Sequence, residues 1–273
     1  MAVRSIRLTI QYDGSRYHGW QIQPGEKTVQ GELVEAVSSL VGRRTHVHGA
    51  SRTDAGVSAL GQVGLFEIDS PIPTENFPDA ISGRLPRDIV ITAAEEAPRK
   101  FDLIGAVTSK LYRYTIYTGR FRPVLQLNQC WHIPKELDVA AMNHAAQLLV
   151  GKKDFKSFAS AADRRENSVR TIFRCEVSSS CIARDASCEK ETQMPQTQYA
   201  IRNTQYEDEW IYVNVEGDGF LYNMVRNIAG TLVDIGYGRW EPEKVSDILE
   251  AKSRTAAGRL APPQGLCLMW IKY

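Results

Sequence analysis

The chain has 273 residues, and its 33 lysines and arginines nearly balance 32 aspartates and glutamates, for a formal net charge of +1. Hydrophobic residues make up 43% and charged residues 24%, which is typical of a globular protein and too apolar for a disordered one. No run approaches the ~18 apolar residues of a membrane span, and we expect no signal peptide. Five cysteines without a CxxC pair argue against a disulfide framework and predict reduced thiols in a cytoplasmic protein.

The first part of the chain alternates strand and helix patterns. Residues 4–12 alternate apolar and polar side chains, which predicts a half-buried strand. Thr28 and Gly42 flank a helical pattern, as a cap and a stop signal. The other elements expected before residue 106 are strands over 45–50, 62–68 and 89–93 and a short helix over 74–85.

The rest of the chain repeats this mixture. The expected strands cover 111–118, 170–178, 209–216 and 266–271, and the expected helices follow Asp138 and cover 220–235 and 242–251. The polar stretch 179–206 lacks periodicity and is predicted to be a long loop inserted between two strands. Antiparallel-type strands mixed with helices in both halves predict an α+β fold.

Two segments concentrate positive charge although the whole chain is nearly neutral. Residues 99–122 and 152–174 are rich in lysine and arginine, with tyrosine and phenylalanine among them. Such segments can follow a phosphate backbone. Charge alone does not separate this interpretation from ordinary solvated strand and loop faces.

The strongest local motif is Ser51-Arg52-Thr53-Asp54-Ala55-Gly56-Val57. Small neighbours and Gly56 allow Asp54 to lie on a tight, exposed turn. An arginine partner, for which Arg52 is the nearby candidate, would lower the pKa of the carboxyl group and suit it to act as a nucleophile or base. The alternative is a turn aspartate that bonds only its local backbone.

Two further motifs carry candidate functional side chains. Arg226 lies in an otherwise apolar helix pattern, where a buried charge needs a partner, unless the side chain extends to solvent. Tyr112 and Tyr114 share one face of a predicted strand, and one ring could stack on a nucleic-acid base. Ordinary cross-strand packing is the alternative.

Other chemistry finds little support. His46 and His48 could lie on one side of a strand, but the sequence offers no third metal ligand near them. Phosphate loops, dinucleotide fingerprints and Gly-x-Ser-x-Gly are absent from the sequence. We therefore expect no metal and no organic cofactor, and an aspartate is the best candidate nucleophile.

In combination, these motifs resemble the tRNA pseudouridine synthase A family over nearly the whole chain, apart from 179–206. The resemblance is carried by Tyr12-Asp13-Gly14, Gly19-Trp20-Gln21, Val29-Gln30, Arg52-Thr53-Asp54-Ala55-Gly56-Val57, Gly61-Gln62-Val63, Tyr112-Arg113-Tyr114, Asp154-Phe155 with Ser157-Phe158, Gly219-Phe220-Leu221 with Met224-Val225-Arg226-Asn227, and Ala261-Pro262 before Gly265-Leu266.

The resemblance implies two related halves, 1–105 and 106–273, of ferredoxin-like or RRM-like type. They would share a mostly antiparallel sheet with helices on one side and a central basic cleft. It also implies a cytoplasmic, cofactor-free homodimer that isomerises uridine to pseudouridine at positions 38–40 of the tRNA anticodon stem-loop. The implied site residues are Asp54 as nucleophile, Arg52 beside it, Arg226 paired with its carboxylate, Tyr112 stacked on the target uracil, and Leu266 lining the uracil pocket.

The sequence departs from the family pattern at two positions, with Ser51 where glycine is usual and Ser58 where histidine is common. If position 51 requires a positive φ, the loop would be strained or reshaped. Two other functions stay open. One is a catalytically silent RNA-binding protein on the same scaffold, and the other is a glycoside or nucleoside hydrolase with Asp13 or Asp218 as a second acid.

Overall fold

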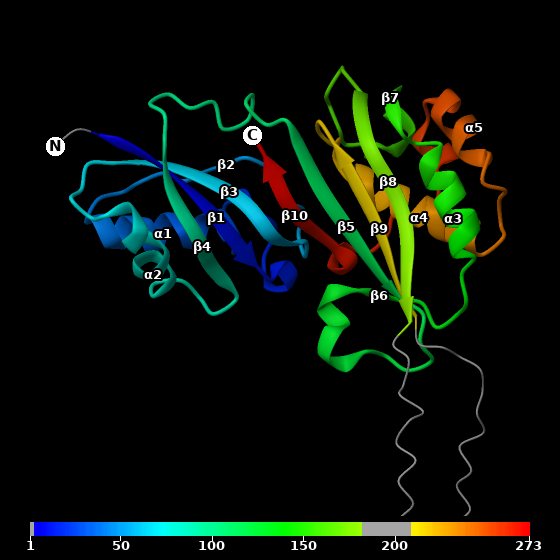
Figure 1. The fold of residues 1–273 in the computed structure, drawn as a ribbon, viewed down its shortest axis with the longest axis horizontal. Coiled ribbons are helices and arrows are strands. Elements are labelled where there is room, and N and C mark those ends of the chain that lie inside the picture. Colours follow the sequence, from blue (N-terminus) through cyan, green and yellow to red (C-terminus); the bar gives the residue numbers. More distant parts are fainter. Residues whose placement is uncertain (1–2, 182–208) are drawn as a thin grey trace, which may run out of the picture.

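In the part of the chain that the structure describes, the strands form one ten-stranded sheet, and the helices pack to one side of it (Figure 1). The computed structural model describes residues 3–181 and 209–273. In these ranges the strands are β1 (Arg4–Tyr12), β2 (His48–Gly49), β3 (Ser58–Ile68), β4 (Ile89–Ala97), β5 (Ser109–Tyr117), β6 (Trp131–His132), β7 (Gly151–Asp154), β8 (Val169–Cys181), β9 (Glu209–Gly217) and β10 (Leu266–Lys272). The α-helices are α1 (Val29–Val41), α2 (Phe77–Ser82), α3 (Val139–Gln147), α4 (Met224–Gly236) and α5 (Lys244–Ala251).

The C-terminal strand joins the two parts of the sheet. The strand order is β4-β1-β3-β10-β5-β9-β8-β7, with β2 beside β3 and β6 beside β5. All neighbours are antiparallel except β10 with β3 and β5 with β6. The contact between β10 and β3 is short, and Cys267 and Leu268 pair with Ser58 and Ala59. The expected α+β class with a mostly antiparallel sheet is therefore confirmed.

Local sequence signals explain several of these elements. The apolar positions of β1 point into the core, where Ile6, Leu8 and Ile10 are fully buried. Thr28 caps α1 by accepting a hydrogen bond from the Gly31 amide, and Gly42 ends the helix at φ 70°. The strand and the two helix ends could be predicted from the sequence because these signals depend only on neighbouring residues.

Some predicted bounds were wrong for identifiable reasons. The strand expected over 45–50 is reduced to β2, because side chains of α1 form hydrogen bonds with backbone groups that a strand would use. The Thr45 amide donates to the Ser38 hydroxyl, and the Gln30 side chain donates to the Val47 carbonyl. The helix expected over 220–235 begins only at Met224, because Asn223 before it adopts a left-handed conformation at φ 62°. The strand expected over 62–68 already begins at Ser58.

Other predictions concern regions that the structure does not test. The insertion expected over 179–206 lies mostly outside the described residues, and its first three residues end β8. The boundary expected after residue 105 falls in the connection between β4 and β5, and the division into halves 1–105 and 106–273 stays a prediction. Among the described helices, none combines the length and the hydropathy that crossing a membrane requires.

Gly14 connects the fold to the loop that carries Asp54. A Cβ atom at Gly14 would collide with the backbone carbonyl of Val57, whereas a Cβ at Gly83 would lie 3.3 Å from the nearest oxygen. We expect Gly14→Ala to lower the free energy of unfolding by about 1–3 kcal/mol, the usual range for overpacking. Gly83→Ala should stay within about 0.5 kcal/mol of the parent. Urea denaturation of both variants measures the difference, and equal stability would contradict the close approach.

Candidate active site

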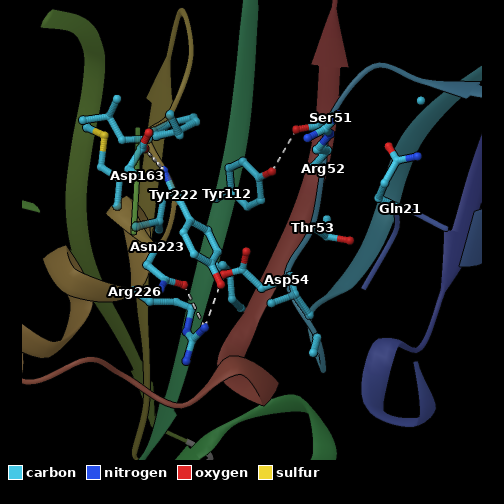
Figure 2. Close-up of a pocket in the computed structure, with 18 of the residues that line it drawn as sticks. Gln21, Ser51, Arg52, Thr53, Asp54, Tyr112, Asp163, Tyr222, Asn223 and Arg226 are labelled. Carbon is cyan, nitrogen blue, oxygen red and sulfur yellow. Dashed lines mark hydrogen bonds and ion pairs between the residues drawn. The ribbon is translucent and has the colours of Figure 1, made fainter. Parts of the chain in front are cut away.

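A cleft of about 940 Å³ opens at the seam between the two parts of the sheet. Its walls include widely separated segments: part of 18–26, residues 49–55 with Val57, two side chains of β5, residues 162–165, residues 220–226 and the start of β10 (Figure 2). The five site residues that the family resemblance implies all line this cleft, namely Asp54, Arg52, Arg226, Tyr112 and Leu266. The fold therefore brings all five together.

Backbone contacts fix the loop that carries Asp54. The Thr53 carbonyl accepts a hydrogen bond from the Trp20 amide at 3.1 Å, and the Thr53 hydroxyl lies 2.7 Å from that of Tyr12. The Val57 amide donates to the Asp54 carbonyl at 3.1 Å, which closes a turn. Gly56 has φ 79°, a backbone conformation that residues with a side chain disfavour. The turn therefore requires glycine at this position.

Arg226 is the ionic partner of Asp54. It lies in the first turn of α4, and its Nη1 is 3.2 Å from Asp54 Oδ2 and 3.0 Å from Asn223 Oδ1. Its Nε donates to the Ala261 carbonyl at 2.8 Å. The side chains of Asp54 and Arg226 are only 20% and 12% exposed, so the pair is largely removed from water. Arg226 is thus paired and does not extend to solvent.

The charge balance at Asp54 corrects an expectation. Burial raises the pKa of the Asp54 carboxyl above its usual value, and the charge and hydrogen bond of Arg226 only oppose that rise. Arg52 lines the cleft but forms no ion pair with Asp54. The proposed pairing of Asp54 with Arg52, and the net lowering of the pKa, were therefore wrong. The reason is that desolvation of a carboxylate outweighs one partner at this depth.

Tyr112 presents an aromatic surface in the same cleft. Tyr112 is 6% exposed, and Phe220 packs edge-on against its ring with the ring centroids 5.2 Å apart. Burial raises the pKa of the phenol to about 12, so the hydroxyl keeps its proton at neutral pH. Tyr114, on the same strand face, is instead fully buried and donates to the Pro262 carbonyl. Tyr112 is the stacking candidate, and Tyr114 belongs to the core.

Positive groups without a carboxylate partner face the cleft. In the described part of the chain, Arg52, Lys110 and Arg164 line it and form no ion pair. Lys110 donates to the Ala50 carbonyl at 2.8 Å, and burial lowers the pKa of its ammonium group to about 8. Arg165 also lines the cleft, but unlike these three it forms an ion pair, with Asp163. The unpaired cations are the ones available to an anionic ligand.

The residues proposed for the alternative functions, a second catalytic acid and a metal site, lie outside the cleft. Asp13 and Asp218 do not line the cleft: each accepts a backbone amide, from Ser15 and Thr171 respectively. His46 and His48 also lie outside it and are exposed. Within residues 3–181 and 209–273, no cluster of three histidine, cysteine, aspartate or glutamate side chains could hold a metal ion.

Both unusual serines fit their positions. Ser51 does not have a positive φ, so the anticipated backbone strain does not occur. Its hydroxyl lies 3.1 Å from the Tyr112 hydroxyl (Figure 2). Ser58 accepts the Gly14 amide at 3.1 Å and lies outside the cleft.

Sequence reasoning missed several supporting groups. Asn223 and the Ala261 carbonyl hold Arg226, and Asp163 accepts the Tyr222 amide at 2.8 Å. Ala261 belongs to one of the motifs that carry the resemblance, and Asn223 lies between the two parts of another. Their role as acceptors depends on the three-dimensional path of the backbone, which no spacing in the sequence reveals.

Comparisons with known proteins agree with one another. The model of a family described as tRNA pseudouridine synthase matches residues 8–103 and 145–273. A protein named tRNA pseudouridine synthase A from Caldicellulosiruptor saccharolyticus is 39% identical over 271 residues, which is 99% of this chain and 100% of that protein. Proteins of the same name from Ruminiclostridium cellulolyticum and Geotalea uraniireducens are 41% and 38% identical, with the same coverage of each chain.

The Arg226–Asp54 pair makes a prediction about titration. Replacing Arg226 by Met removes the contact that opposes burial, so the pKa of Asp54 should rise further. Arg226→Lys keeps a positive charge and should raise it less. Carboxyl ¹³C shifts followed against pH measure the change, with the Asp54 signal assigned through Asp54→Asn. An unchanged or lower pKa in Arg226→Met would contradict the assignment.

Proposed function

The chain belongs to the tRNA pseudouridine synthase family, and we propose that it isomerises uridines at positions 38–40 of the tRNA anticodon stem-loop, with Asp54 as the nucleophile. The observation that carries the proposal is the pairing of a desolvated aspartate with Arg226 beside an aromatic ring in an open cleft.

The reaction requires no external reactant. The C1′–N1 bond of the nucleotide breaks, the uracil turns, and a C1′–C5 bond forms. The proton displaced from C5 leaves and N1 gains one, so atoms balance. Asp54 supports this by attacking the sugar or the base, or by assisting elimination, and in each case the ionised carboxylate is the reactive form. Arg226 supports the ionised form, because it opposes the effect of burial.

The target base must leave its stack before it reaches Asp54. Extrusion of a nucleotide costs a few kcal/mol, and stacking on one aromatic ring returns about 1–3 kcal/mol. Tyr112, together with Leu266, which also lines the cleft, is our proposed receiving surface. Most of the affinity then comes from phosphate contacts, for which Arg52, Lys110 and Arg164 are the proposed cations.

The competing functions have less support. A hydrolase with two carboxylates needs a proton-donating acid near Asp54. Asp163 lines the same cleft, but its hydrogen bonds from Arg165 hold its pKa well below the usual range, so it stays ionised. A silent RNA-binding protein would not require the Arg226–Asp54 pair. The proposal further includes a homodimer and a cytoplasmic location, both taken from the family resemblance.

Replacing Asp54 by Asn tests the nucleophile. The amide keeps the shape but cannot attack, so we expect pseudouridine formation to fall by about 10⁴-fold or more, as when other enzymes lose a nucleophile. Binding of tRNA should persist. Release of tritium from C5-tritiated uridine in tRNA measures turnover, and filter binding measures affinity. Asp163→Asn is the matched control in the same cleft and should keep far more activity. Turnover by Asp54→Asn would remove Asp54 from the mechanism.

The modified positions form a separate prediction. Incubating an unmodified tRNA pool with the protein should produce pseudouridine at positions 38, 39 and 40 and leave other uridines unchanged. Chemical mapping of the pool with and without protein measures this. Pseudouridine confined to other positions would overturn the site assignment while keeping the activity, and release of free uracil would favour the hydrolase.

A further inference from the structure

We propose that Ser51 is a positioning residue, whose hydroxyl holds the Tyr112 ring in the orientation that receives the extruded base. This inference rests on the proposed function. It concerns a side chain that is not among the site residues assigned above. Three features of the structure support it.

The first feature is direct contact. Ser51 Oγ lies 3.1 Å from the Tyr112 hydroxyl, within hydrogen-bond distance, and both side chains line the cleft. Figure 2 shows the two hydroxyls pointing toward one another across the space between the Asp54 loop and β5. A phenol is a better donor than a serine hydroxyl, so the natural arrangement has Tyr112 donating to Ser51.

The second feature is that the ring is restrained at two points. Phe220 packs edge-on against Tyr112 at an interplanar angle of 87°. That contact limits how the ring can tilt, but it does not hold the hydroxyl end. The bond to Ser51 holds this end, so the two contacts together fix the ring before substrate arrives. Such preorganisation removes an ordering cost from the step in which the base docks.

The third feature is that the backbone at Ser51 is held by contacts that do not involve its hydroxyl. Gln62, which is fully buried, donates to the Ser51 carbonyl at 2.8 Å and accepts its amide at 3.3 Å. Lys110 holds the preceding carbonyl, that of Ala50. Because these contacts involve only the backbone of residues 50 and 51, the loop keeps its path when the hydroxyl is removed.

The expected effect falls on the rate and spares the affinity for tRNA. Phosphate contacts bind the tRNA first, and the base docks on Tyr112 afterwards. Removing Ser51's hydroxyl should therefore lower the single-turnover rate at saturating tRNA by about 5-fold, the effect of one ordinary hydrogen bond. The dissociation constant for tRNA should change by less than about 2-fold, because Ser51 carries no charge.

The test is a double-mutant cycle of Ser51→Ala with Tyr112→Phe, in single-turnover pseudouridine formation on unmodified tRNA. Either single variant removes the bond, so Ser51→Ala should cost nothing further in the Tyr112→Phe background. Ser51→Thr retains a hydroxyl and should restore most of the rate. Ser58→Ala is the matched control, since Ser58 bonds Gly14 and not Tyr112, and it should combine additively with Tyr112→Phe.

The outcomes distinguish this inference from the proposed function. Additive losses for Ser51→Ala and Tyr112→Phe, or an unchanged rate for Ser51→Ala, would overturn the positioning role while the parent protein remains active. A thermal midpoint of Ser51→Ala close to that of the parent excludes a folding defect as the cause of a loss. A parent protein that forms no pseudouridine would instead contradict the proposed function.

Discussion

The site depends on one constraint, which is that a carboxylate taken out of water needs a fixed positive partner. Arg226 supplies it from 172 positions further along the chain. A guanidinium so little exposed also needs acceptors of its own, and it has three: Asp54, Asn223 and the Ala261 carbonyl. The pair therefore ties together the Asp54 loop, the start of α4 and the segment that leads into β10.

Close backbone packing makes this geometry available. A side chain at Gly230 of α4 would collide with the Arg259 carbonyl, and one at Gly258 would lie 2.8 Å from Thr231. Glycine at both positions lets residues 257–261 lie directly against α4. The Ala261 amide then donates to the Arg226 carbonyl, while the Ala261 carbonyl accepts from the Arg226 side chain. After this segment β10 enters the sheet between β3 and β5, at the seam where the cleft opens.

The sequence allowed us to predict local features, which depend on adjacent residues. It did not allow us to predict contacts between distant segments, which depend on the three-dimensional path of the chain. The caps of α1, the alternation of β1 and the turn at Gly56 were all predictable, because each follows from a few adjacent residues. Physics alone suggested Arg52 as the partner of Asp54, since it is the nearest arginine in sequence, and only the family resemblance indicated Arg226. Of the lysines and arginines in the two basic segments, just Lys110, Arg164 and Arg165 line the cleft.

The raised pKa of Asp54 does not argue against its proposed role. A carboxylate surrounded by water is stabilised by that water and reacts sluggishly, so partial desolvation favours attack as long as the group remains ionised. Arg226 limits the rise, and the Tyr112 phenol, with a pKa of about 12, adds no second negative charge beside it. Burial thus acts on both acids in the same direction. It keeps the phenol neutral, whereas the Arg226 guanidinium favours the anion of Asp54, so only Asp54 has a partner that opposes the effect of burial.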